Sequence, residues 1–135
     1  MREIKFRAWD VNNNKMYESY CVDDEGNFCV NIDYTNDLET LNINNIIQMQ
    51  YTGLKDKNGV DIYEGDIVTN YYTTEDFICK KTVEDSYYKT IEHTSKCVVS
   101  WDSHWGSWKI HNGAGRGQFE VIGNIYENPE LLKSE

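Results

Sequence analysis

Turn-forming residues interrupt this sequence so often that the segments between them have room only for short strands or single helical turns. Clusters rich in Asn, Asp and Gly stand at residues 11–15, 23–27 and 56–59. Asn and Gly tolerate the left-handed backbone that tight turns require. In the first segment, Ile4, Phe6 and Ala8 occupy alternate positions, which is the pattern of a strand with one buried face. The chain is therefore predicted to form short antiparallel strands.

The composition favours strands as well. Ile and Val number 21, against five Leu and two Ala, and β-branched residues prefer strands whereas Leu and Ala prefer helices. Ten Tyr, four Trp and four Phe supply rings that bury much area per residue. We expect a mostly β fold (all-β, or β-rich α+β) with small SH3-like or barrel-type antiparallel sheets. At 135 residues, a single domain over 1–135 is expected.

Two regions depart from the regular strand pattern. Residues 70–96 contain tyrosines, threonines and charges with poor periodicity, so we predict an insertion there, either a long hairpin or a mobile arm. Near the end, Asn128 and Pro129 suit the cap and the first position of a short C-terminal helical turn. Residues 33–45 are polar and rich in Asn, and we expect a surface loop or one helical turn.

Charge and cysteine usage narrow the class of protein. The net charge of −10 arises from acidic residues spread along the chain, without a stripe of Lys and Arg, so direct binding to nucleic acid is disfavoured. No run of 18 apolar residues is present and no signal peptide begins the chain, so we expect no membrane segment and a cytoplasmic protein. The four cysteines form no C-x-x-C pair and are expected to be reduced, buried thiols.

No catalytic constellation stands out. The glycines of residues 113–117 lack the spacing of a phosphate-binding loop, and a predicted strand follows them, so a hairpin turn is favoured. His93, His104 and His111 match no metal-site spacing. A Cys–His pair between Cys97 and His104 or His111 is conceivable but otherwise unsupported. We predict a non-enzymatic protein with no catalytic residue, no metal and no cofactor; an enzyme without a recognisable motif is the least favoured alternative.

The aromatic residues supply the candidate binding residues. Trp101 shares a predicted strand face with Cys97 and Val99. If Trp101 and Trp108 point inward, Trp105 lies near a surface, where a large ring suits a partner contact; the alternative is that all three pack in the core. The tyrosines of the insertion admit a similar interpretation as an adaptable contact arm. The predicted partner-binding residues are Trp105, Tyr71, Tyr72, Tyr87 and Tyr88.

Several long blocks resemble one known family. They are MREIKFRAWD at residues 1–10, MQYTGLKDKNG at 49–59, IYEGDIV at 62–68 and VIGNIYENPELL at 121–132. Together they are similar to the YopX family of phage and prophage proteins, and they cover both ends and the middle of the chain. The resemblance implies a small, mostly β protein of phage or prophage origin, and therefore a location in the cytoplasm of a bacterial host cell. It implies no established activity and no defined binding residues, and residues 70–96 differ most from the pattern.

These observations lead to one functional expectation and one alternative. We expect a phage or prophage accessory protein that binds a host or phage protein, with its acidic residues complementing a basic partner surface. Self-association into a homo-oligomer is also compatible with the strand edges and aromatic residues. The alternative is a nucleic-acid-associated module in phage replication or regulation, which the negative charge makes less favoured.

Overall fold

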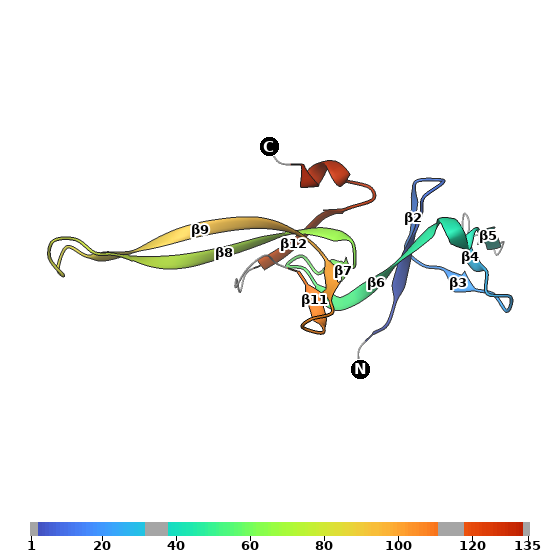
Figure 1. Ribbon diagram of the computed structural model, residues 1–135, viewed down its shortest axis with the longest axis horizontal. Helices are drawn as coiled ribbons and strands as arrows, with labels where there is room; N and C mark the ends of the chain where they lie inside the picture. Colours follow the sequence, from blue (N-terminus) through green and yellow to red (C-terminus); the bar gives the residue numbers. More distant parts are fainter. Residues whose placement is uncertain (1–2, 32–37, 111–117, 134–135) are drawn as a thin grey trace.

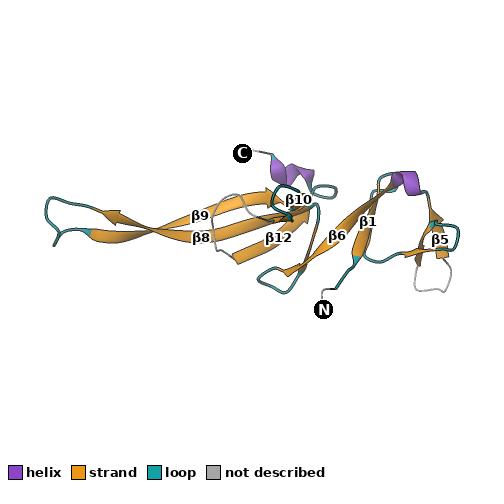
Figure 2. Cartoon of the chain, turned by 60° about the horizontal axis from the view of Figure 1, so that its bottom comes forward, coloured by secondary structure: helices purple, strands orange, loops and turns teal. Residues whose placement is uncertain are grey.

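The computed structural model describes residues 3–31, 38–110 and 118–133. Within them the chain is mostly strand, arranged in several small antiparallel sheets, one of which is curled into a half-barrel. Two single turns of 3-10 helix, η1 (Ile43–Asn45) and η2 (Pro129–Leu132), are the helical elements that Figure 2 shows. The prediction of a mostly β fold with a short C-terminal helical turn is confirmed.

The N-terminal half contains two small sheets. A four-stranded sheet has the order β2-β1-β6-β7 and is built from β1 (Phe6–Asp10), β2 (Lys15–Tyr17), β6 (Ile46–Lys55) and β7 (Asp61–Tyr63). It encloses a cluster of Trp9, Met49, Tyr51 and Tyr63. Strands β3 (Cys21–Val22), β4 (Phe28–Asn31) and β5 (Leu38–Leu41) form the second sheet, whose core is Phe28, Val30 and Leu41.

The C-terminal half is organised around one long hairpin. Strands β8 (Asp66–Ile78) and β9 (Tyr87–Val98) pair along their whole length, and β12 (Gln118–Asn124) adds to β8. A short hairpin of β10 (Ser100–Asp102) and β11 (Ser107–Lys109) follows β9. The core of this half consists of Val68, Cys97, Val99 and Ile110, and Ile62 of β7 in the N-terminal sheet packs in the same cluster.

The long hairpin extends well past its sheet. Among the described residues, β12 pairs with β8 as far as Gln118 opposite Tyr71, whereas β9 continues beside β8 as far as the pair of Ile78 and Tyr87. Residues 71–94 begin at this last described pair with β12 and continue as two paired strands, and we call this projection the arm. Figure 1 shows the arm reaching away from the rest of the molecule, which we call the body.

Several local predictions differ from the structure for reasons of pairing. A single strand was predicted for residues 15–22, but β2 pairs with β1 while β3 pairs with β4, so the chain changes sheet between them. Within residues 38–45, η1 agrees with the expected helical turn, but β5 is a strand that was not predicted. This strand is stabilised by its ladder with β4 rather than by a local pattern. The predicted glycine turn at 113–117 lies outside the described residues.

Burial also departs from the predicted patterns at particular side chains. Trp101 is 49% exposed although Cys97 and Val99 are buried, because β9 ends at Val98 and a new strand begins at Ser100. Asn128 precedes η2 but its side chain makes no capping hydrogen bond; its Oδ1 accepts from the backbone N–H of Asn124 at 3.3 Å.

The prediction of buried cysteines holds for two of the four. Cys29 and Cys97 are buried, and Cys21 and Cys79 are exposed. Cys21 lies on the two-residue strand β3 and Cys79 just after β8. All four are free thiols.

Candidate interaction surface

The arm is anchored where β8 begins, at a buried ion pair. Asp66 is 1% exposed and its carboxylate pairs with the guanidinium of Arg7 on β1, itself 8% exposed. The same carboxylate accepts a hydrogen bond from the backbone N–H of Tyr63 at 2.8 Å, and the Arg7 guanidinium lies 4.6 Å from the centre of the Tyr63 ring. The first residue of the long hairpin is therefore fixed to the N-terminal sheet.

Two effects shift the pKa of Asp66 in opposite directions. Burial raises the pKa of the Asp66 carboxyl, and the nearby Arg7 guanidinium opposes that shift. Charged groups are buried at high desolvation cost unless they are paired and hydrogen-bonded. The Asp66 carboxylate meets that condition, because it accepts hydrogen bonds from the Arg7 guanidinium and from the backbone N–H of Tyr63.

The backbone beside Asp66 joins β9 and the C-terminal segment to the same junction. Gly65 adopts a φ of 84°, a left-handed conformation that glycine accommodates without strain. Its N–H donates to the carbonyl of Val99 at 2.9 Å, and its carbonyl accepts from Ile125 at 2.9 Å. The N–H of Val99 donates to the Asp66 carbonyl at 2.8 Å. The start of β8 and the end of β9 are therefore joined by hydrogen bonds at one junction.

A second anchor holds β12 against the body. Oδ2 of Asp56 accepts from the N–H of Val121 at 3.0 Å, and its Oδ1 accepts from Asn58 at 2.8 Å and Val60 at 2.9 Å. Burial raises the pKa of the Asp56 carboxyl, but these three donors together lower it below its usual range. The turn at residues 56–59, predicted from sequence, thus also docks onto a strand far along the chain.

Pairing within the arm sorts its side chains onto two faces. Residues directly opposite each other in an antiparallel pair share a face, and successive residues alternate. The inner face, continuous with the buried pair of Val68 and Cys97, carries the pairs Tyr72–His93, Thr74–Ile91, Asp76–Lys89 and Ile78–Tyr87. The outer face carries the pairs Tyr71–Thr94, Thr73–Glu92, Glu75–Thr90 and Phe77–Tyr88.

The outer face presents an aromatic pair to solvent. The rings of Phe77 and Tyr88 lie 5.1 Å apart, yet the two residues remain 52% and 69% exposed. Two exposed carboxylates, Glu75 and Glu92, lie on the same face. Nearer the body, an open hollow of about 610 Å³ is lined by Tyr71, Tyr72, Thr73, Glu92, His93, Thr94 and Gln118. The outer face therefore combines uncovered rings with negative charge.

The inner face is more closely packed within the arm itself. The rings of Tyr72 and His93 stack at 4.8 Å, and His93 Nε2 lies 2.9 Å from the Thr74 hydroxyl. Ile78 and Ile91 are half-buried. Side chains on this face thus contact one another across the two strands.

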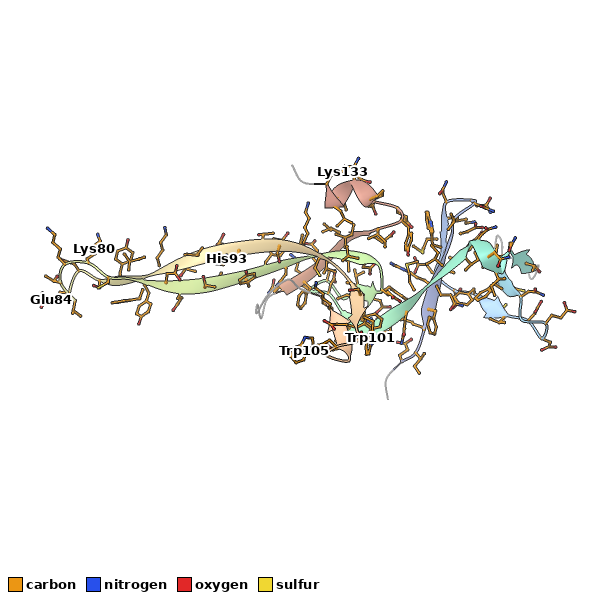
Figure 3. The ribbon with its side chains drawn as sticks, viewed as in Figure 1. Lys80, Glu84, His93, Trp101, Trp105 and Lys133 are labelled. Carbon is orange, nitrogen blue, oxygen red and sulfur yellow. The ribbon has the colours of Figure 1, made fainter. Side chains whose placement is uncertain are left out.

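Trp105 lies apart from the arm. It occupies the turn between β10 and β11 and is 76% exposed. Oδ1 of Asp102 accepts from the backbone N–H groups of His104 at 2.9 Å and of Trp105 at 3.3 Å. Trp101 packs edge-on against Trp108 at 5.2 Å. Figure 3 shows Trp101 and Trp105 on the body, away from the arm that carries His93 and Lys80.

The structure therefore divides the predicted binding residues among three places. Tyr72 and Tyr87 lie on the inner face, Tyr71 and Tyr88 on the outer face, and Trp105 on the body. Adjacent tyrosines in a strand point to opposite sides, so neither Tyr-Tyr pair belongs to one surface.

Sequence reasoning missed Arg7 and Asp66, which position the arm. The predicted strand with Ile4, Phe6 and Ala8 on one buried face leaves Arg7 on the opposite, solvent face. In the structure β1 is central in its sheet, and the residues from Arg7 to Asp10 are all buried. The Gly65–Asp66 step within the EGD segment is the local signal, because a left-handed glycine before a buried strand marks a constrained turn. No sequence pattern near residues 65 and 66 indicates that Asp66 pairs with Arg7, which is 59 residues away.

Among residues 3–31, 38–110 and 118–133, no three His, Cys, Asp or Glu side chains are grouped so that they could hold a metal ion. Among the helical segments in the same part of the chain, none has the length and hydrophobicity that crossing a bilayer requires.

The fold and its anchored arm define a small, mostly β protein with a projecting hairpin. Its sequence matches the YopX protein family over residues 5–133, and the chain belongs to that family. No curated protein gives a match.

Two crystal structures are similar to this chain over nearly its whole length. Protein EF1440 from Enterococcus faecalis has 27% sequence identity and a TM-score of 0.56, covering 98% of this chain and 100% of that chain. Protein YopX from Bacillus subtilis has 22% identity and a TM-score of 0.52, with coverage of 98% and 100%. This second likeness is one of fold. The names of these proteins state no activity and no partner.

Proposed function

We propose that this protein is a non-enzymatic accessory protein of the phage or prophage type that binds a protein partner through the outer face of its arm. The observation that carries the proposal is the exposed Phe77–Tyr88 pair on a hairpin that projects beyond its sheet. Aromatic side chains are enriched where binding energy concentrates in protein interfaces.

Charge indicates the kind of partner. Between residues 73 and 92, the paired positions of the outer face carry two charged side chains. They are Glu75 and Glu92, and both are acidic. A basic surface complements them, and such complementarity raises association rates and selects partners more than it adds affinity. The partner we propose is therefore a host or phage protein with a basic patch beside an apolar pocket.

Affinity capture from bacterial lysate, with and without nuclease, tests this proposal. The baits are the tagged full chain, a Phe77→Ser/Tyr88→Ser variant, and Trp105→Ser. Val60→Ser is the matched control, because Val60 is an apolar residue of the body that is 48% exposed. We expect a protein that survives nuclease treatment to be captured by the wild type, the control and Trp105→Ser, and to be lost from the arm variant.

Other outcomes would contradict the proposal in distinguishable ways. Capture lost with Trp105→Ser but retained by the arm variant would move the binding surface to the body. Capture that disappears with nuclease and with rising salt would favour the nucleic-acid-associated alternative. Unchanged capture by every variant would show that neither surface binds the partner.

A further inference from the structure

Two of the four cysteines face each other across a strand pair. Cys21 on β3 is directly opposite Cys29 on β4, and residues that are directly opposite share one face of a sheet. The Sγ atom of Cys21 lies 3.4 Å from the carbonyl oxygen of Cys29. Among the strand pairings that the structure describes, this is the one place where a cysteine is opposite another cysteine.

The spacing of paired strands suits a bond between these two side chains. Directly opposite residues of an antiparallel pair have Cα atoms about 4.5–5.5 Å apart, and disulfides span Cα separations of roughly 4.4–6.8 Å. Both thiols are free in this structure. A disulfide between Cys21 and Cys29 is therefore compatible with the pairing of β3 and β4.

The two thiols lie on the side of their sheet that faces away from its hydrophobic cluster. Phe28, Val30 and Leu41 form that cluster. Cys29 stands between Phe28 and Val30 along β4, so its side chain points to the opposite face. Packing of the hydrophobic cluster therefore does not explain why two cysteines stand opposite each other here.

The two thiols differ in their access to solvent. Cys21 is exposed, whereas Cys29 is only 4% exposed. Burial raises the pKa of the Cys29 thiol, a hydrogen bond with Thr40 opposes that shift, and the charge of Asp23 reinforces it. Because the thiolate is the nucleophile, a dissolved oxidant meets Cys21 first, and Cys29 remains a neutral thiol beside it.

We propose that Cys21 and Cys29 form a reversible disulfide when the protein meets a peroxide. The Cys21 thiolate attacks one oxygen of hydrogen peroxide; its S–O bond forms as the O–O bond breaks, and the released hydroxide takes up a proton to become water. The Cys29 sulfur then attacks the sulfenic acid on Cys21. The S–S bond forms as the S–O bond breaks, and hydroxide leaves with the Cys29 proton as water. The two sulfurs together lose two electrons, and the peroxide gains them.

The bond fixes a strand that is otherwise weakly held. Strand β3 has two residues, both exposed, and pairs with β4 at two positions. The disulfide closes residues 21–29 into a covalent loop, and such a cross-link stabilises mainly by restricting the unfolded chain. Exposed disulfides are the ones that thiols reduce readily, which makes the bond reversible. This inference does not rest on the proposed function, because neither cysteine belongs to the arm.

Peptide mapping of peroxide-treated protein tests the inference. The full chain is reduced, freed of reductant and exposed to hydrogen peroxide, and the remaining thiols are then alkylated. Cleavage after Glu25, which lies between the two cysteines, gives peptides that stay joined only through a disulfide. We expect the loss of two of the four free thiols, a linked pair of peptides containing Cys21 and Cys29, and recovery of both thiols on addition of dithiothreitol.

Single variants separate the two steps. In Cys29→Ser the reaction should stop at a sulfenic acid on Cys21, which dimedone traps. In Cys21→Ser, Cys29 should stay reduced over the peroxide doses that convert wild type. Cys79→Ser is the matched control, because Cys79 is also exposed but lies outside the pair, and it should form the disulfide as wild type does. Far-ultraviolet circular dichroism of each variant establishes that its β-structure is retained.

Three results would overturn the inference. They are a wild-type chain in which Cys21 and Cys29 stay unlinked after Cys79 has been oxidised; linked peptides that join either cysteine to Cys79 or Cys97 as often as to each other; and a Cys21→Ser variant in which Cys29 is oxidised as readily as in wild type. Partner capture by the outer face of the arm is a separate measurement, so the failure of either proposal leaves the other standing.

Discussion

At the scale of single residues, burial determines which ion pairs matter. The Arg7–Asp66 pair is almost fully buried, whereas Lys57 and Glu120, joined at 3.2 Å, are each about a third exposed. A buried pair broken by the loss of one partner leaves an uncompensated charge, while an exposed pair contributes little because water screens it. Neutralising the acidic partner should therefore destabilise the fold much more in the Arg7–Asp66 pair than in the Lys57–Glu120 pair.

Replacing Asp66 with Asn tests the buried pair. The change leaves the Arg7 guanidinium without its counter-ion, so we expect a loss of about 3–5 kcal/mol in the free energy of unfolding. The matched change Glu120→Gln should cost less than about 1 kcal/mol. Urea denaturation followed by circular dichroism measures both, and similar costs for the two variants would contradict this account of the anchor.

Asp61 makes the stability depend on pH in acid. Its carboxylate accepts hydrogen bonds from Lys5 and Lys55, each at 2.6 Å, and these two ammonium groups lower the pKa of Asp61 to about 2. A carboxyl with a lowered pKa in the fold stabilises the protein above its unfolded pKa of about 3.9, and the contribution disappears as the pH falls through the folded pKa.

We therefore expect Asp61→Asn to be less stable than wild type near neutral pH. The difference should shrink as the pH falls below about 4 and should vanish below about pH 2. Denaturant unfolding of both proteins across this range measures it. A difference that is independent of pH would show that the ionised carboxylate does not stabilise the fold.

At the scale of elements, close packing fixes η2 on strand β12. A Cβ atom at Gly123 would lie 2.6 Å from Oδ1 of Asn128 and 2.9 Å from Cδ1 of Leu131. Glycine at this position therefore lets the last helical turn approach the strand.

Gly123→Ala is expected to destabilise the protein by about 1–3 kcal/mol, because the added methyl overpacks this contact. The cost should be smaller in an Asn128→Ala background, which removes the atom in closest contact. A double-mutant cycle by thermal unfolding measures this coupling. Equal costs in the two backgrounds would mean that Asn128 does not contact position 123.

The arm is the element that the body should tolerate losing. Tyr72 and His93 are cross-strand neighbours, so residues 73–92 can be replaced by the turn-forming pair Asn-Gly. The anchor of the hairpin at Asp66 and the anchor of β12 at Asp56 both lie outside the deleted segment. We expect the free energy of unfolding of the body to stay within about 0.5 kcal/mol, the range usual for changes away from core and anchors. A large loss would show that the arm is part of the fold.

Sequence reasoning succeeded where neighbouring residues specify the structure and failed where pairing with a distant residue determines it. The turn at residues 56–59 was predicted because Asp, Asn and Gly specify it locally. Strand β5 was missed because it depends on pairing with β4, and the burial of Arg7 was missed because Asp66 is 59 residues away. The tyrosines of residues 71–88 were predicted as exposed contact residues, but their division between two faces depends on the register of β8 against β9.

At the scale of the whole molecule, the residues that stabilise the fold lie apart from the exposed residues that we propose bind a partner. Three small hydrophobic clusters hold the body together. The buried carboxylates of Asp66 and Asp56 fix the base of the projecting hairpin and the strand β12 beside it (Figure 1). Exposed aromatic side chains are concentrated on that hairpin and on the Trp105 turn. The central claim is that the arm binds the partner and that the body positions the arm.

Capture with the arm-shortened chain tests this claim most directly. Tagged wild type and the variant in which Asn-Gly replaces residues 73–92 are used as baits in the same nuclease-treated lysate, after unfolding curves have shown that both bodies are folded. The account predicts a protein bound to wild type and absent from the shortened chain. Equal recovery of that protein by a folded, armless body would contradict it.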